Sequence, residues 1–227
     1  MTTLFITGID TDIGKSVACG ALANTLLNLG VDVCTQKWVE TGCEQVSQDL
    51  ITHQAPIQRN LNPHDESLHS PYRFKFAASP HLAAKLENRE IDTNYLQEQT
   101  QKLRAKSDHL LIEGAGGLCV PFNSNELLVD LVQSMNLPIV LVTSGRLGSI
   151  NHTLLSLELC SHRNIEIRAI IYNQYPLQDE TITNDTRNYL QNYLEDKNIN
   201  TLWLELTENA QSMDLDRNQL EQLLSAS

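Results

Sequence analysis

The sequence predicts an α/β fold with a doubly wound, mostly parallel β-sheet and helices on both of its faces. Three observations lead to this class. Short β-branched apolar segments recur along the chain, longer segments with the apolar spacing of helices separate them, and a glycine-rich turn joins the first strand to the first helix. No internal repeat, low-complexity tract or break in composition divides residues 1–227, so we expect a single domain.

Strands are expected where short apolar runs are bounded by polar or turn-forming residues. They cover Leu4–Thr7, Val31–Lys37, His109–Ile112, Ile139–Thr143, Ile167–Tyr172 and Thr201–Leu206. Helices are expected where apolar residues follow the helical period, and the first of them ends at Gly30, a frequent C-terminal cap. They cover Gly14–Leu29, His81–Arg89, Asn94–Ser107, Asn125–Met135, Ile150–Arg163, Thr181–Asp196 and Asp214–Ser225. The polar segment Gln54–Ser79 contains three prolines and is expected to be a long ordered excursion.

Charge and apolar pattern exclude several classes of partner. The chain carries 16 Lys+Arg against 28 Asp+Glu, a formal net charge of -12, which does not suit a phosphate backbone, so we expect no nucleic-acid partner. No apolar run approaches the roughly 20 residues needed to span a bilayer, so we expect no membrane partner and a cytoplasmic location. The cysteines form no C-x-x-C pair, which favours reduced structural thiols at Cys19, Cys34, Cys43, Cys119 and Cys160.

The segment Gly8-Ile9-Asp10-Thr11-Asp12-Ile13-Gly14-Lys15-Ser16 follows an apolar strand and opens a helix. Its backbone N–H groups and the helix N-terminus offer positive charge to phosphates, Lys15 can reach the β and γ oxygens, and the Ser16 hydroxyl can ligate Mg²⁺. Five residues separate the two glycines where the common phosphate-binding loop has four, so the loop is a longer variant. It predicts a P-loop NTPase-like fold. The alternative is an ordinary strand-to-helix turn with a solvated lysine.

Two further segments follow predicted strands. In His109-Leu-Leu-Ile-Glu113-Gly-Ala-Gly-Gly117, the acid stands where Mg²⁺ needs an oxygen ligand and the glycines let a ligand approach the backbone. In Gln36-Lys37-Trp38-Val39-Glu40-Thr41-Gly42, Lys37 places a second cation beside the loop, where it can neutralise an anionic intermediate or the transferring phosphate. Taken alone, Glu113 could cap a turn and Lys37 could be a surface lysine.

Together, Gly8-x-Asp-Thr-x-x-Gly-Lys-Ser, Lys37-x-x-x-Thr-Gly42, Glu113-Gly-Ala-Gly-Gly117 and Leu147-Gly-x-x-Asn-His152 resemble the dethiobiotin synthetase family in order and approximate spacing. The resemblance covers nearly the whole chain. It implies a Mg²⁺- and ATP-dependent ligase of biotin synthesis that converts 7,8-diaminopelargonic acid and CO₂ or bicarbonate to dethiobiotin. The implied intermediates are a carbamate and a carbamic–phosphoric anhydride.

The resemblance also implies site residues. The catalytic residues are Lys15, which holds the γ-phosphoryl group, Lys37, which faces the carbamate, and Thr11. The nucleotide-binding residues are Asp12, Ile13, Gly14, Lys15, Ser16, Val17, Glu113 and Asn173. The substrate-binding residues are Thr11, Lys37, Thr41, Gly148 and Asn151. The metal ligands are Ser16, Asp49 and Glu113.

Three of these assignments carry further expectations. The Asn173 amide can pair with a donor and an acceptor on the purine edge. The helix that begins in Leu147–His152 is implied to receive the distal carboxylate of the substrate across a homodimer interface. The alternatives are a solvent-facing turn for Leu147–His152 and a solvated helix position for Asp49. The remaining histidines lack metal-ligand spacing and are expected on surfaces or at caps, namely His53, His64, His69, His81, His109 and His162.

The chain departs from the family pattern at two places. Lys37-Trp38 replaces the common Lys-Pro, and Leu204-Glu205-Leu206-Thr207 replaces a Gly-x-[IVL]-P segment that packs on the base. The second departure leads us to expect weaker nucleotide selectivity than the usual ATP preference. The rival functions are a partitioning ATPase or amidoligase, against which Lys37-x-x-x-Thr-Gly42 argues, and a nucleotide-binding module without catalysis.

Overall fold

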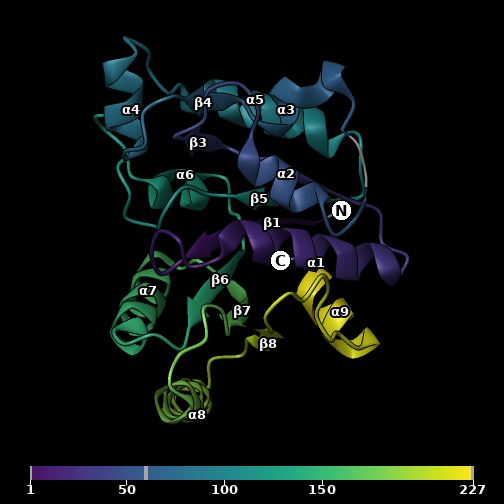
Figure 1. Cartoon of the computed structure of the whole chain (residues 1–227), viewed down its shortest axis with the longest axis vertical. Coiled ribbons are helices and arrows are strands. Elements are labelled where there is room, and N and C mark those ends of the chain that lie inside the picture. Colours follow the sequence, from purple (N-terminus) through teal and green to yellow (C-terminus); the bar gives the residue numbers. More distant parts are fainter. Residues whose placement is uncertain (1, 59–60, 226–227) are drawn as a thin grey trace.

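The fold centres on one parallel sheet. The computed structural model describes residues 2–58 and 61–225 of the chain. Six strands pair in the order β2-β5-β1-β6-β7-β8, and all of their pairings are parallel (Figure 1). They are β1 (Thr2–Gly8), β2 (Val33–Lys37), β5 (His109–Glu113), β6 (Ile139–Ser144), β7 (Ile167–Asn173) and β8 (Leu202–Leu206). The six predicted strands are therefore confirmed, and each end lies within two residues of its expected place.

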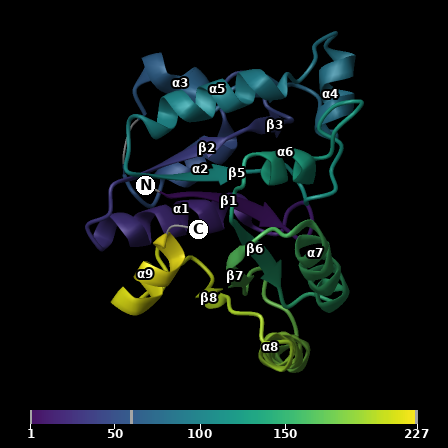
Figure 2. The same cartoon turned by 180° about the vertical axis from the view of Figure 1, so that it is seen from behind.

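Helices connect the strands and cover both faces of the sheet, as the sequence predicts. They are α1 (Lys15–Asn28), α2 (Gln48–Gln54), α3 (Glu66–His69), α4 (Pro80–Leu86), α5 (Thr93–Arg104), α6 (Leu128–Ser134), α7 (Ser149–Arg163), α8 (Glu180–Asp196) and α9 (Arg217–Leu224). Helices α1 and α9 pack on one face, and α5, α6, α7 and α8 pack on the other (Figures 1 and 2). Among the described residues, no helix is long and apolar enough to cross a membrane.

Burial on both faces explains why the strands are almost uniformly apolar. In β1, Phe5 points into one hydrophobic cluster, whereas Leu4 and Ile6 point into the other. The same alternation places Leu141 of β6 with Phe5 and Val142 with Leu4. Successive side chains of a strand face opposite ways, so a sheet covered on both sides has no polar face to show in the sequence.

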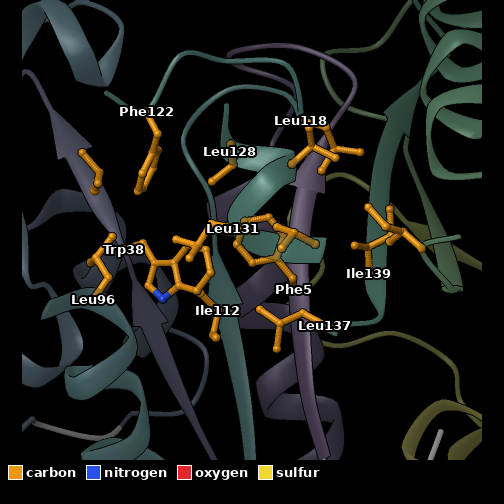
Figure 3. Close-up of a cluster of buried hydrophobic side chains, with 14 of the residues drawn as sticks. Phe5, Trp38, Leu96, Ile112, Leu118, Phe122, Leu128, Leu131, Leu137 and Ile139 are labelled. Atoms are coloured by element: carbon orange, nitrogen blue, oxygen red, sulfur yellow. The ribbon is translucent and has the colours of Figure 1, made fainter. Parts of the chain in front are cut away.

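Trp38, which stands where the family commonly has proline, lies in the first of these clusters (Figure 3). Its ring centroid is 4.9 Å from that of Phe5. Its Nε1 donates to Gln36 Oε1 at 3.1 Å and to Thr100 Oγ1 at 3.0 Å. The buried indole N–H is therefore satisfied, and Trp38 supports the end of β2 from the core while Lys37 lines a pocket.

The region between β2 and α4 contains more secondary structure than predicted. Strand β3 (Val39–Thr41) pairs in parallel with β4 (Tyr72–Phe74), and α2, a 3₁₀ turn at Pro63–Asp65 and α3 lie between them. The sequence predicts Gln54–Ser79 only as a long ordered excursion and does not predict β3, α2 or the short elements within that segment, because elements this short show no measurable apolar period. Residues 59 and 60 of that segment lie outside the described residues.

Two helices begin later than expected because polar side chains build a turn or a cap in front of them. Asn123 Oδ1 accepts hydrogen bonds from the N–H groups of Asn125 and Glu126, so α6 begins only at Leu128. Asp216 caps α9 by accepting from Gln219 N at 2.8 Å. Both cases follow the preference of short polar side chains for positions just outside a helix.

Candidate active site

A pocket of about 840 Å³ opens where β1, β2, β5 and β7 end at the carboxyl edge of the sheet. This edge is where ligands bind in open parallel sheets. The predicted site residues that line it are Thr11, Asp12, Gly14, Lys15, Ser16, Val17, Lys37, Thr41, Asp49, Glu113 and Asn173. Of the described residues that line the pocket, none comes from the start of α7, where Gly148 and Asn151 lie.

The glycine-rich loop reaches α1 through left-handed backbone conformations at Asp12 (φ 56°) and Gly14 (φ 93°). A Cβ at Gly14 would lie 2.4 Å from Nδ2 of Asn173, so glycine is required for steric as well as conformational reasons. Asn173 Nδ2 donates to the Ile13 carbonyl at 2.9 Å and ties the end of β7 to the loop. Because Gly14 has no side chain with which to cap α1, the first N–H groups of that helix are available for phosphate oxygens.

Lys15 is buried at the start of α1, and its Nζ donates to the Asp10 carbonyl at 2.8 Å. Burial and the charge of Lys37 lower the pKa of Lys15 to about 8. A bound phosphate would stabilise the charged form of this amine, because an opposite charge nearby raises the pKa of a lysine.

A cluster of charged side chains forms the base of the pocket. Lys37 Nζ lies 2.6 Å from Glu113 Oε1 and 2.7 Å from Asp49 Oδ2. The Ser16 hydroxyl lies 2.7 Å from Asp49 Oδ1 and 2.9 Å from Glu113 Oε1. The four side chains come from α1, β2, α2 and β5, so the tertiary fold alone brings them together.

The charges in this cluster stabilise one another. Burial opposes the ionised form of Glu113, but Lys37 and His53 hold the pKa of this carboxyl well below its usual range. Burial likewise opposes the charged form of Lys37, but Glu113 and Asp49 hold its pKa above the usual range. The base of the pocket therefore contains an ionised carboxylate and an ammonium group that remain charged at neutral pH.

Helix α2 places Asp49 in the cluster, although the sequence did not predict this helix. Ser47 Oγ caps it by accepting from Leu50 N at 3.0 Å. Glu40 Oε1, from β3, accepts from Gln48 N at 2.9 Å and from Asp49 N at 3.2 Å. Glu40 was not singled out from the sequence, because nothing in its spacing shows that β3 meets the first turn of α2.

His53 is a site residue that the sequence analysis missed. It is fully buried, and its Nε2 lies 2.5 Å from Glu113 Oε2. The expected surface or cap position is therefore wrong for His53, and also for His69, whose buried Nδ1 lies 2.6 Å from the Thr35 carbonyl oxygen. The available signal was the spacing of four residues between Asp49 and His53, which places both on one side of a helix once α2 is recognised.

The other end of the pocket differs in construction. Asn173 Oδ1 accepts from Tyr175 N at 3.1 Å, so backbone partners fix both ends of its amide. Its neighbours along the wall are Tyr175, Pro176, Leu206, Thr207, Glu208 and Asn209. Leu206 is buried as the last residue of β8, so the segment that departs from the family pattern forms a strand end and part of this wall.

The start of α7 lies apart from this pocket. Gly148 adopts a left-handed conformation (φ 90°) in front of the helix, and Leu147 beside it is 79% exposed. Arg146 forms an ion pair with Asp10, which connects this turn to the glycine-rich loop. A separate pocket of about 320 Å³, lined by Arg146, Leu147 and Gly148 among others, opens here.

The sheet and its glycine-lysine loop define a P-loop NTPase-like protein. Among solved structures, the chain is similar to the MinC:MinD cell division protein complex of Aquifex aeolicus (TM-score 0.55, 11% identity, 98% of this chain and 85% of that chain). It is also similar to a ParA family ATPase from Chlorobium tepidum TLS (TM-score 0.51, 17% identity, 99% and 89%). Identities this low show the fold alone.

Sequence comparison identifies the family. A family described as "AAA domain" matches residues 2–203. The chain is 46% identical to ATP-dependent dethiobiotin synthetase BioD 2 of Pasteurella multocida over 88% of this chain and 94% of the relative. It is 47% identical to ATP-dependent dethiobiotin synthetase BioD of Chlorobaculum tepidum over 81% of this chain and 77% of the relative. The chain belongs to the ATP-dependent dethiobiotin synthetase family.

Proposed function

We propose that the protein is an ATP-dependent ligase that forms C–N bonds and converts 7,8-diaminopelargonic acid, CO₂ and ATP to dethiobiotin, ADP and phosphate. The observation that carries the proposal is the shared pocket of the glycine-lysine loop, Lys37 and the carboxylates of Asp49 and Glu113. Both hydrophobic clusters pack on one sheet, which supports a single domain, and we propose a cytoplasmic location for it.

The base of the pocket fits Mg²⁺. The Ser16 hydroxyl lies within hydrogen-bond distance of both the Asp49 and the Glu113 carboxylate, so one hydroxyl and two carboxylates are available as ligands. Both carboxylates also bind the Lys37 ammonium group, which supports a preference of this site for cations. Over residues 2–58 and 61–225, no three His, Cys, Asp or Glu side chains are grouped to hold a metal, so water and phosphate oxygens would complete the ligand set. Mg²⁺ bound here would offset charge on the β and γ oxygens of ATP.

The reaction begins when one amine of the substrate adds to CO₂ and loses a proton, which gives a carbamate. A carbamate oxygen then attacks the γ-phosphorus and ADP leaves. The second amine attacks the carbonyl carbon of the resulting anhydride, loses a proton and expels phosphate as the ring closes. Lys15 stabilises the γ-phosphoryl oxygens, Lys37 exchanges its carboxylate partners for the carbamate, and the hydroxyls of Thr11 and Thr41 contact the substrate.

The remaining residues bind the nucleotide and the far end of the substrate. Asp12, Ile13, Gly14 and Val17 supply the loop and helix backbone to the phosphates, and Asn173 faces the purine with the amide hydrogen and lone pair that its backbone contacts leave. We further propose a homodimer in which the N–H groups near Gly148 and Asn151 serve the site of the partner subunit. The exposure of Leu147 (79%), just before α7, and of Leu155 (61%), midway along α7, supports an apolar surface for the partner.

The test is phosphate release by the purified protein with Mg²⁺, ATP and bicarbonate, with and without 7,8-diaminopelargonic acid. Release that requires the diamine, together with dethiobiotin in the product, is the expected result. Release that is indifferent to the diamine would favour a partitioning ATPase. Nucleotide binding without any release would favour a binding module.

A further inference from the structure

We propose that His53 is a positioning residue that fixes the orientation of the Glu113 carboxylate for metal binding. The inference rests on the proposed function, which makes Glu113 a metal ligand.

The two carboxylate oxygens of Glu113 contact different partners. Oε2 lies 2.5 Å from His53 Nε2, whereas Oε1 faces Lys37 Nζ at 2.6 Å and Ser16 Oγ at 2.9 Å. Both His53 and Glu113 are buried, so water does not compete for this hydrogen bond. With Oε2 held by the ring, the carboxylate presents Oε1 to the pocket. Partners that orient a metal ligand in this way affect metal affinity without touching the metal.

Helix α2 makes this contact possible because its backbone packs directly against Gly20 of α1. A Cβ at Gly20 of α1 would lie 2.9 Å from the Thr52 carbonyl oxygen and 3.0 Å from Cα of His53. The missing side chain at Gly20 therefore lets α2 approach until His53 reaches Glu113. The same helix carries Asp49 one turn earlier, so it supplies one proposed ligand and orients another.

The test compares three variants. His53→Leu removes the donor and keeps an apolar side chain, whereas His53→Gln places an amide N–H near the position of Nε2. His69→Leu is the matched control, because His69 is also buried and hydrogen-bonded but its ring contacts the Thr35 carbonyl oxygen. Two quantities are measured: the Mg²⁺ concentration for half-maximal diamine-dependent phosphate release, and the increase in Tm that MgADP causes relative to ADP with EDTA.

We expect His53→Leu to raise the half-saturating Mg²⁺ concentration about 10- to 100-fold, to lower kcat at saturating Mg²⁺ much less, and to reduce the MgADP effect on Tm. His53→Gln should restore most of the original Mg²⁺ requirement and most of the MgADP effect on Tm. His69→Leu should lower Tm itself but change neither the Mg²⁺ requirement nor the MgADP effect. An unchanged Mg²⁺ requirement in His53→Leu, or an equal increase in His69→Leu, would overturn the inference.

Two provisions keep the test decisive. If His53→Leu does not fold, His53→Asn replaces it, because an asparagine amide is too short to reach Glu113 from the same backbone position. If the unchanged protein shows no diamine-dependent release, the proposed function fails, yet the MgADP effect on Tm still judges the role of His53.

Discussion

The two ends of the pocket are built on different principles. At the proposed phosphate end, charged and polar side chains from α1, β2, α2 and β5 hold one another in place through contacts of 2.5–2.9 Å, and three of them, Lys37, His53 and Glu113, are buried. At the opposite end, where we propose that the purine binds, the wall is formed by a strand end and by loop residues such as Tyr175, which is 56% exposed. Charges fixed before the substrate arrives stabilise a transition state most effectively, whereas an exposed wall adapts to its ligand. Substitutions should therefore have their largest effects at the phosphate end.

The largest expected effect is that of Lys37→Ala. Removing one fixed group that stabilises developing negative charge should lower kcat by about 10²- to 10³-fold or more. Lys15 cannot replace it, because Lys15 is assigned to the γ-phosphoryl group and not to the carbamate. The affinity for MgADP, measured by calorimetry, should stay within about threefold of the original value.

Lys15→Ala is the control for this prediction, since it should abolish phosphoryl transfer and also weaken MgADP binding. A Lys37→Ala protein whose kcat stays within about tenfold of the original, or whose kcat and nucleotide affinity fall in parallel, would contradict the assigned role.

Glu113→Gln should cause the next largest change, in both metal dependence and stability. It leaves Lys37 and His53 buried beside a neutral amide, and breaking a buried ion pair in this way costs about 3 kcal/mol or more of the free energy of unfolding. Urea titration measures the change. Glu98→Gln is a suitable control, because its ion pair with Lys102 is exposed and should contribute no more than about 0.5 kcal/mol.

The low pKa of Glu113 adds a pH dependence to the same comparison. The ordinary pKa is 4.5 and that of the folded state is lower, so the stabilisation by Glu113 is complete above pH 4.5 and is lost as the pH falls through the folded-state value. The unchanged protein should thus lose more stability than Glu113→Gln below this pH. Equal slopes in urea titrations over the acid range would show that the carboxylate is not specially stabilised.

The same contrast explains how much the sequence could predict. The six strands were predictable because burial on both faces leaves uninterrupted apolar runs. Lys37 and Glu113 were predictable because they end such runs, and Lys15 because a glycine-rich loop joins the first run to the helix that Lys15 begins. Helix α2 was not, because its seven residues are too few to show a period. His53 acts through a contact with Glu113, which lies 60 residues further along the chain, and no local pattern encodes such a contact. Glu40 acts over eight to nine residues, but only because the chain folds back so that β3 meets the start of α2.

Gly20→Ala should have an intermediate effect, transmitted from outside the pocket. The added methyl group would press on the backbone of α2 at Thr52 and His53, and such overpacking costs about 1–3 kcal/mol. Because α2 carries Asp49, the Mg²⁺ requirement for phosphate release should rise together with the loss of stability. A loss of stability without any change in the Mg²⁺ requirement would mean that α2 can move without disturbing the charged cluster.

The smallest expected effect concerns the base of the nucleotide. We predict that kcat/KM for ATP exceeds that for GTP or CTP by less than about tenfold, equivalent to roughly 1.4 kcal/mol, in diamine-dependent phosphate release. One reason is that the Asn173 amide already forms hydrogen bonds with the backbone of Ile13 and Tyr175, which leaves fewer of its polar atoms for the base. The other is that the facing segment Leu206–Asn209 lacks the proline that the family commonly packs on the base. An ATP preference above tenfold would show that the exposed wall makes selective contacts with the base. The distinction between a fixed phosphate end and an adaptable purine end would then be wrong.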